Sequence, residues 1–339
     1  MLVPLLLAAT LTAPATTDSV RITHLPALPG HTATEAVAVN GWGHVAGTST
    51  GPDGRRAVLW RHGGVLDAGP GDAVALNRRD QVLRLERGDT GPYARHPRIW
   101  HEGVTTDITP GGAGYVVASA INASGAVPMT YSTSPYGYHQ EVAAVWRGSV
   151  QGLSESGSHL SVGVITDGGL VAGSKLPMFG SDVYAFKCSG TSCSRLADAP
   201  GTGGYSVTAA NESGVVVGNR GDRPLRWAGD AVTVLPGGAG AVSSSKQAVN
   251  ERGDVVGRTG DRATLWRDGL AVVLDVPAPS GAVAVSDSGD VVGWSGSRAF
   301  LWRAGRVVWL GEGFPVGLND FGVVVGQEGN RAVLWRVRR

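Results

Sequence analysis

Two short motifs have the residue types of a catalytic or a metal site. Gly47-Thr48-Ser49-Thr50-Gly51 fits the G-x-S-x-G pattern of a nucleophilic serine. That chemistry needs a strand-to-helix turn, and no helical periodicity surrounds the motif. Asp287 and Asp290 lie in an Asp-Ser-Gly-Asp segment that resembles part of a calcium loop. Related segments elsewhere read Asn-Glu-Ser-Gly-Val and Asn-Asp-Phe-Gly-Val, so these carboxylates belong to a turn. We therefore predict no catalytic residue, no metal and no cofactor.

The histidines offer no metal site either. His44, His62 and His101 are expected near strand ends or turns, where water or neighbouring groups satisfy them. His96 and His101 are five residues apart in one expected strand, so their side chains point to opposite faces. No pair has the spacing of metal ligands.

The turn motifs belong to a sequence repeat that recurs along the whole chain. Segments 250–267, 286–303 and 319–336 repeat it most clearly, and alignment on its tryptophan gives eight copies. The aligned residues are Trp60, Trp100, Trp146, Lys187, Trp227, Trp266, Trp302 and Trp335. Neighbouring copies are 33 to 46 residues apart, and a period near 40 is typical of propeller blades. The seven tryptophans are predicted to be structural, filling the spaces between neighbouring sheets.

Each copy divides into four expected strands. The first strand ends in Asn or a substitute, and a glycine follows three residues later in seven copies, which is the pattern of a tight hairpin. A valine run, the Ala-x-Leu-Trp strand and a last strand ending near Leu follow. Two positions before the Asn, seven copies have a small residue, which suits strands crowded around a central axis. These residues are Ala38, Ala75, Ala120, Ala209, Ala248, Ala284 and Gly317.

The two ends of the chain complement each other. The last copy stops after its third strand, whereas residues 20–28, before the first copy, resemble a fourth strand. We therefore predict an all-β fold, an eight-bladed β-propeller of four-stranded antiparallel blades that forms a single domain over residues 20–339. The N-terminal strand is expected to close the ring by pairing with the C-terminal blade, within residues 316–336.

The pattern A-x-x-(I/V)-N-x-x-G-x-V-V-G, followed by A-F-L-W-x-x-G, resembles the HAF repeats of bacterial extracellular proteins. The repeats are named for a His-Ala-Phe tripeptide, and the nearest forms here are Arg298-Ala299-Phe300 and Tyr184-Ala185-Phe186. The resemblance covers the chain from about residue 31 onward. It implies export and a repeat fold. It supplies no catalytic residue, because that family has no established common activity.

The N-terminus and the cysteines also indicate export. Residues 1–15 form a short apolar run that ends in Ala13-Pro14-Ala15 and resembles a secretory signal peptide. The run is too short to span a hydrocarbon core of about 30 Å, and no later stretch is long and apolar enough to do so. In an exported chain, the hairpin spacing of Cys188 and Cys193 favours a disulfide over two free thiols. We expect a secreted, extracellular monomer.

Composition excludes one large class of partner. The chain has 29 basic and 28 acidic residues and no basic block, so we expect no nucleic acid binding. Its hydrophobic content of 42% is enough for a substantial core.

We expect the functional site where the copies of the repeat differ in length. In each of the last four copies the tryptophan follows the end of the valine run by nine residues. In the first four copies this spacing is longer. Blades 1–4 therefore carry insertions between their second and third strands. In an up-and-down blade these loops share one face with the segments that link blades. Every tyrosine and two histidines fall in or beside them: Tyr93, His96, Tyr115, Tyr131, Tyr136, Tyr138, His139, Tyr184 and Tyr205.

Tyrosine combines a rigid apolar ring with a polar tip, which suits sugar and peptide surfaces. We therefore predict a non-catalytic protein that binds a glycan, a cell-wall component or another protein through these loops. Three alternatives remain open: tyrosines packed against their own blades, a repeat protein without a small ligand, and a propeller enzyme. The enzyme would be a polysaccharide lyase or a hydrolase acting at the channel mouth. It would need titratable groups that converge there, whereas the first strands present mainly Ala, Val and Asn.

Overall fold

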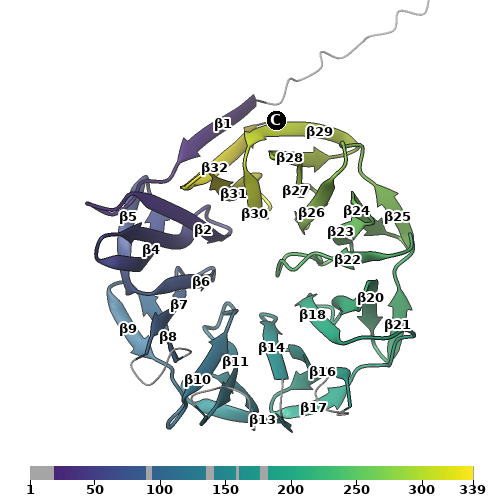
Figure 1. Cartoon of the computed structure of the whole chain (residues 1–339), viewed down its shortest axis with the longest axis horizontal. Helices are drawn as coiled ribbons and strands as arrows, with labels where there is room; N and C mark the ends of the chain where they lie inside the picture. The colour runs from purple at the N-terminus through teal and green to yellow at the C-terminus, as the bar shows by residue number, and fades with distance from the viewer. Residues whose placement is uncertain (1–18, 89–93, 135–140, 158–159, 176–181, 339) are drawn as a thin grey trace, which may run out of the picture.

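The computed structural model describes residues 19–88, 94–134, 141–157, 160–175 and 182–338. These residues form thirty-two strands in eight four-stranded antiparallel sheets. The sheets stand as blades around a central channel (Figure 1), which confirms the predicted eight-bladed propeller. Within the described ranges, no helix is long and apolar enough to cross a membrane. The predicted signal peptide, residues 1–15, lies outside the described residues.

Every blade runs from an innermost strand at the channel to an outermost strand at the rim. The innermost strands are β2 (Ala33–Val39), β6 (Asp72–Leu76), β10 (Tyr115–Ala118), β14 (Leu160–Ile165), β18 (Tyr205–Ala210), β22 (Gly240–Val242), β26 (Ser280–Val285) and β30 (Phe314–Leu318). The second strands are β3 (Val45–Gly51), β7 (Val82–Arg87), β11 (Val127–Ser132), β15 (Val171–Lys175), β19 (Val216–Arg220), β23 (Val255–Thr259), β27 (Val291–Ser295) and β31 (Val323–Glu328).

The two outer positions complete each blade. The third strands are β4 (Gly54–Arg61), β8 (Arg95–His101), β12 (Glu141–Trp146), β16 (Tyr184–Ser189), β20 (Arg223–Ala228), β24 (Arg262–Arg267), β28 (Arg298–Arg303) and β32 (Arg331–Arg338). The outermost strands are β5 (Gly64–Pro70), β9 (Val104–Asp107), β13 (Val150–Gly157), β17 (Ser192–Arg195), β21 (Ala231–Val234), β25 (Leu270–Val273), β29 (Arg306–Glu312) and β1 (Ser19–His24).

The chain ends close the ring as predicted. Strand β1 pairs antiparallel with β32 over six residues, from Ser19 opposite Arg338 to His24 opposite Val333. The strand ends at His24 and is shorter than the predicted segment 20–28. The N–H of Leu25 still donates to the carbonyl of Ala332 at 2.9 Å, and the side chains of Leu25 and Leu28 pack against the core between blades 8 and 1. The first and last segments of the chain therefore share blade 8.

The asparagine that ends an innermost strand both shapes its turn and joins neighbouring blades. The side-chain oxygen of Asn211 accepts the N–H of Val215 at 2.9 Å, and its Nδ2 donates to the carbonyl of Asn250 in the next blade at 2.9 Å. Five other asparagines donate the same inter-blade bond at 2.8–3.2 Å: Asn40, Asn77, Asn122, Asn250 and Asn319. Thr166 and Ser286 hold this position in blades 4 and 7. Their hydroxyl side chains have no amide donor, so the belt of inter-blade bonds has two gaps.

A second belt explains the acidic residues of these turns. The residue after the asparagine is acidic in five consecutive blades: Asp167, Glu212, Glu251, Asp287 and Asp320. Each carboxylate accepts the backbone N–H of the same turn position in the preceding blade. Asp290 pairs instead with Arg303 at 2.6 Å. The Asp-Ser-Gly-Asp segment is thus a turn, as predicted. In the part of the chain that the structure describes, no three His, Cys, Asp or Glu residues form a metal-binding group.

The glycine that closes the valine run is required by a β-bulge in the innermost strand. The register of β2 against β3 shifts between Ala36 and Ala38. A Cβ added to Gly47 would lie 2.0 Å from the carbonyl oxygen of Glu35. Equivalent glycines would place a Cβ within 2.3 Å of a backbone oxygen: Gly173, Gly218, Gly257, Gly293 and Gly326. The segment 47–51 is therefore a strand that Gly47 fits to its neighbour, and Ser49 is buried in it.

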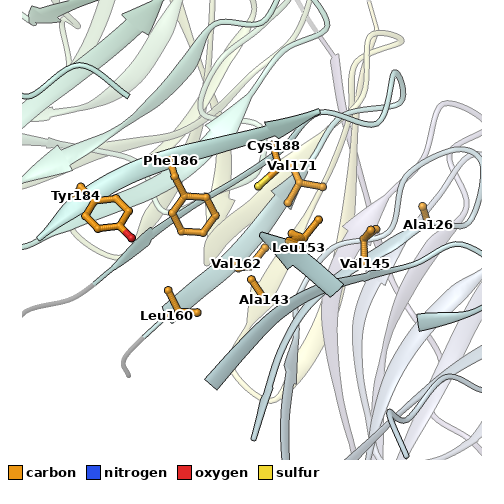
Figure 2. Close-up of a cluster of buried hydrophobic side chains, with 10 residues drawn as sticks. All are labelled: Ala126, Ala143, Val145, Leu153, Leu160, Val162, Val171, Tyr184, Phe186 and Cys188. Atoms are coloured by element: carbon orange, nitrogen blue, oxygen red, sulfur yellow. The ribbon is translucent and has the colours of Figure 1, made fainter. Parts of the chain in front are cut away.

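Apolar clusters between neighbouring blades form the core. Figure 2 shows the cluster between blades 3 and 4, where Phe186 is fully buried beside the aligned position of Lys187. Most of the predicted structural tryptophans are buried, namely Trp60, Trp100, Trp227, Trp266 and Trp335, whereas Trp146 and Trp302 are half-buried. The predicted disulfide is also present, because Cys188 and Cys193 face each other across β16 and β17 and are bonded.

Exchanging the residues of the asparagine belt should change stability in opposite directions. Asn211→Ser removes the amide that donates to blade 6, whereas Ser286→Asn supplies the missing donor toward Asn319. We expect the free energy of unfolding to fall by about 1 kcal/mol in the first variant and to rise by about 1 kcal/mol in the second. Urea denaturation measures both. No gain in Ser286→Asn would mean that the belt sets the turn geometry without holding blades together.

Candidate functional site

A groove of about 570 Å³ lies at the seam where blade 8 meets blade 1. Its walls are formed by Arg21 and residues 23–26, by residues 42–45 and 60–64 of blade 1, and by Leu334 and Arg336 of β32. Residues 21–24 belong to β1, so one wall exists only because the ring is closed by that strand. The groove reaches the face of the asparagine turns, opposite the face that carries the inserted loops.

Trp42 presents a fixed aromatic surface at this groove. Its backbone N–H donates to the side-chain oxygen of Asn40 at 3.1 Å, and its indole N–H donates to the carbonyl of Arg78 in blade 2 at 3.0 Å. The residue is nevertheless 74% exposed. Phe321, at the same turn position in blade 8, is 79% exposed. A flat apolar ring held in one orientation loses little entropy when a ligand stacks on it.

Asp80 replaces the turn glycine in blade 2, and the other seven copies all have glycine at this position. It keeps the left-handed backbone of that position, with φ of 62°, which costs an L-residue about 1 kcal/mol. Its carboxylate accepts from Nδ2 of Asn40 at 2.8 Å and contacts Nδ1 of His44 at 2.9 Å. The ring of His62 meets that of His44 edge-on, with centroids 5.0 Å apart. Asp80 therefore fixes the orientation of an imidazole that lines the groove.

Arg336 at the groove lacks the carboxylate partner that its repeat position has in blade 7, and it faces a second arginine, Arg21. In blade 7 the arginine after the repeated tryptophan, Arg303, pairs with Asp290 on the neighbouring strand. In blade 8 the corresponding carboxylate position is Val323. Arg336 instead stands directly opposite Arg21 across β32 and β1, and both are exposed. No ion pair is formed by either arginine among the described residues.

Facing arginines repel each other in an antiparallel pair. A carboxylate or another anion in the groove would remove that repulsion and accept several N–H donors from the two guanidinium groups. The seam therefore combines an aromatic platform, an oriented histidine and two unpaired cations. This combination suits a ligand that carries both a flat apolar face and negative charge.

Two of the predicted ligand-binding tyrosines are packed inside the ring. Tyr205 is 1% exposed, and its hydroxyl accepts the N–H of Ala199 at 2.9 Å. Tyr184 is buried in the cluster of Figure 2 and donates to Glu155 at 2.8 Å. Burial and this hydrogen bond raise the pKa of Tyr184. Both rings serve the core and offer no open surface to a ligand, so the sequence-based assignment is corrected for these two residues.

The other predicted binding residues divide into two groups. Tyr115 and Tyr131 are half-buried on adjoining rungs of β10 and β11, and His96 is half-buried with Nδ1 3.4 Å from the Thr109 hydroxyl. The second group lies outside the described residues: Tyr93, Tyr136, Tyr138 and His139. A binding surface on the inserted loops of blades 1–4 stays a prediction.

The residues at the seam groove were not predicted from the sequence, although two of them depart from the repeat pattern. Trp42 is one of three tryptophans that do not occupy the aligned position, and Asp80 is the exception to the turn glycine. Arg21 and Arg336 could not be paired without knowledge of the register of β1 on β32.

No family model matches the chain, and no curated protein sequence matches it. Solved structures share its fold. A puromycin-hydrolysing peptidase from Mycobacterium tuberculosis aligns with 84% of this chain and 56% of its own, at 13% identity and a TM-score of 0.53. The β-propeller domain of the Trilobed protease from Pyrococcus furiosus aligns with 90% of this chain and 96% of its own, at 9% identity and a TM-score of 0.51.

A virginiamycin B lyase from Staphylococcus aureus aligns with 94% of this chain and 100% of its own, at 9% identity and a TM-score of 0.48. At 13% and 9% identity, the likeness to the peptidase and to the Pyrococcus domain shows the propeller fold alone. The Pyrococcus domain is described as having an open velcro topology, whereas here β1 closes the ring on β32.

Removing one of the facing arginines should not harm the free protein. We expect Arg336→Gln to leave the free energy of unfolding unchanged or to raise it by about 0.5 kcal/mol at low salt, because a like-charge pair is lost. The matched variant Arg303→Gln leaves the buried Asp290 without its ion pair and should cost about 3 kcal/mol. Urea denaturation at about 20 mM and about 500 mM NaCl separates the two effects. Destabilisation of Arg336→Gln as large as that of Arg303→Gln would show that Arg336 has a structural partner.

Proposed function

We propose that this chain is a secreted, non-catalytic binding protein whose ligand is a glycan that carries carboxylate groups. The observation that carries the proposal is the placement of Trp42 beside the unpaired Arg21 and Arg336 in one groove. Three features support export: the signal-like N-terminus, the resemblance to HAF repeats and the disulfide between Cys188 and Cys193.

A sugar ring has a C–H face that stacks on an indole and an edge of hydroxyl groups that hydrogen-bond with polar side chains. At the seam, Trp42 offers the stacking face, and His44, His62 and Arg61 offer polar groups around it. Arg61 already pairs with Glu102 at 2.6 Å, so Arg21 and Arg336 are the cations left for a uronate carboxylate. An acidic cell-wall polysaccharide has this chemistry.

The inserted loops of blades 1–4 form the second part of the proposal. Tyr115 and Tyr131 lie at the base of this region, and the sequence adds Tyr136, Tyr138 and His139 to it. The loops emerge on the face opposite the seam groove. The two surfaces would therefore contact different ligands or different parts of one polymer.

Binding to acidic polysaccharide should depend on the seam groove. We expect wild type to bind polygalacturonate, and Trp42→Ala and Arg336→Gln each to weaken binding about tenfold or more. Leu270→Ala is the matched control, because Leu270 is 67% exposed on blade 6 and far from the seam. A Tyr136→Ala/Tyr138→Ala double variant reports on the loops. Affinity electrophoresis in gels with polygalacturonate or neutral dextran measures retention.

Equal retention of Trp42→Ala and wild type would overturn the seam as the binding site. Loss in the double tyrosine variant alone would move the site to the inserted loops. Equal retention by dextran and polygalacturonate would remove the role of the two arginines.

One observation favours an enzyme as the second candidate. His44 and Asp80 form a dyad in which a carboxylate orients an imidazole at the wall of the groove, which is the arrangement of a general base. With a carboxylate held by Arg21 and Arg336, such a base suits a lyase that works by β-elimination. The base takes the proton next to the carboxylate, a carbon–carbon double bond forms, the neighbouring glycosidic C–O bond breaks, and the leaving oxygen takes a proton from water. The dyad lies at the seam and not at the channel mouth, where the sequence analysis had placed a possible enzyme site.

Asp80→Gly separates binding from turnover. The substitution restores the residue of the other seven copies at a backbone conformation that glycine prefers, so the fold should persist. If the chain is a lyase, wild type will generate an unsaturated, ultraviolet-absorbing product from polygalacturonate. Asp80→Gly and His44→Gln will then lose that activity while still binding the polymer. No product from wild type would leave the non-catalytic binding protein as the better description.

A further inference from the structure

Blade 6 has an insertion at the point where six of the other seven blades have a bulge. In blade 7 a single residue, Val283, bulges between Ala282 and Ala284. In blade 6 the strand β22 ends at Val242, and pairing resumes where the carbonyl of Ala248 accepts the N–H of Val256. Five residues, 243–247, lie between them. The segment leaves the blade and reaches into the central channel (Figure 1).

The inserted segment is held firmly in the channel. The hydroxyl of Ser243 donates to the carbonyl of Val283 at 2.7 Å. The side-chain amide of Gln247 donates to the carbonyl of Leu318 at 2.7 Å and accepts its N–H at 3.1 Å, which connects blade 6 to blade 8 across blade 7. A Cβ on Gly317 would lie 2.8 Å from Oε1 of Gln247. Gly317 is small because Gln247 occupies this space.

These contacts place Lys246 in the channel. The channel cavity has a volume of about 430 Å³ and is walled by innermost strands and by the inserted segment. Its lining is mainly Ala, Val, Leu and Ile, and Lys246 is the only ionisable residue among the described residues that line it. The ammonium nitrogen lies 3.3 Å from the position that a Cβ on Gly163 would take in blade 4, and the Ser119 hydroxyl lies 2.7 Å from the same point.

The cation at this place has no counter-charge. Lys246 is exposed to the open channel, yet the ring surrounds it on most sides, and this desolvation lowers its pKa to about 8. Among the described residues no carboxylate pairs with it, and the strands that face it contribute no titratable side chain to the channel lining. Arg258 lines the adjoining groove and adds positive charge nearby. A desolvated ammonium with apolar walls and hydroxyl neighbours is a partial site that an anion would complete.

We propose that the central channel binds a small organic carboxylate, whose charged end pairs with Lys246 and whose apolar body lies against the Ala and Val walls. The hydroxyl of Ser245, which accepts the N–H of Gln247 at 3.1 Å, can donate to the same carboxylate, and Ser119, whose hydroxyl makes a long bond of 3.4 Å to the carbonyl of Gly163, lines the same cavity. The site is separate from the seam groove, which shares no lining residue with it. Its volume is that of a pocket for one small molecule and not for a polymer.

Lysine chemistry allows a direct test in the wild-type protein. The chain has three lysines, Lys175, Lys187 and Lys246, so acetylation by acetic anhydride can be followed at each by mass spectrometry. We expect 3-phenylpropanoate to slow the acetylation of Lys246 about tenfold at saturation and to leave Lys175 and Lys187 unaffected. The neutral analogue 3-phenylpropanol should protect none of them.

Variants then assign the charge. By calorimetry, Lys246→Met should weaken 3-phenylpropanoate binding about tenfold or more, whereas Lys246→Arg retains it and the control Lys187→Met matches wild type. Because only the ammonium form pairs with the carboxylate, wild-type affinity should be constant between about pH 6 and pH 7, where the ligand is fully ionised, and fall as pH rises past about 8. Lys246→Arg should lose this pH dependence. Melting temperatures confirm that each variant is folded.

Three results would overturn the proposal. They are equal affinity of wild type and Lys246→Met for 3-phenylpropanoate, equal binding of the acid and the alcohol, and unprotected Lys246 at millimolar acid. The acetylation result stands on wild-type protein, so a variant that fails to fold does not remove the test.

Discussion

The antiparallel pairing of β1 with β32 is the constraint on which the ring and its seam depend. A single blade exposes two apolar faces, and each is buried only by a neighbour, so the eighth blade has to meet the first. Six residue pairs between the two chain ends complete blade 8, and the bond from Asn319 to the carbonyl of Asn40 carries the asparagine belt across the junction. Strand β1 contributes Val20 to the core between blades 7 and 8, and Arg21, Thr23 and His24 to the seam between blades 8 and 1, where the candidate groove lies.

The repeat also explains why the seam is chemically different from the other inter-blade spaces. In blades 6 and 7 the arginine after the tryptophan is neutralised by a carboxylate on its own blade, as Arg267 is by Asp254. At the seam a valine replaces that carboxylate and Arg21 approaches Arg336. Asp80 likewise keeps a left-handed backbone that glycine would adopt at lower cost, and it orients His44. A chain that gives up stability at several places in one groove has the pattern expected of a binding or catalytic site.

The features that could be predicted from the sequence are those that recur in the repeat. The turn asparagine and the buried tryptophan recur in most copies, so the number of blades could be predicted by aligning the eight copies. The two chain ends resemble the missing parts of one blade, so ring closure could be predicted as well. The inter-blade hydrogen bonds of the asparagine belt could not be predicted. The sequence shows that the Asn can cap its own turn, but not that its Nδ2 also donates to the next blade. Tyr184 and Tyr205 were placed in the binding surface because their neighbours in sequence are loops. Which way a ring turns at a strand end depends on the tertiary partners, here Glu155 and Ala199.

Lys246 and Trp42 were missed because each occurs in one copy only, and a feature without a repeat needs the structure to place it. The channel and the seam differ in what a ligand would do to the ring. A molecule in the groove contacts β1 and blade 1 together, so its binding free energy adds to ring closure. A molecule in the channel contacts innermost strands, among them β2 of blade 1 and β30 of blade 8, and it does not contact β1. Occupation of the groove therefore acts directly on the pairing of the chain ends. A ligand in the channel stabilises the closed ring as a whole, because the channel is complete only when the ring is closed.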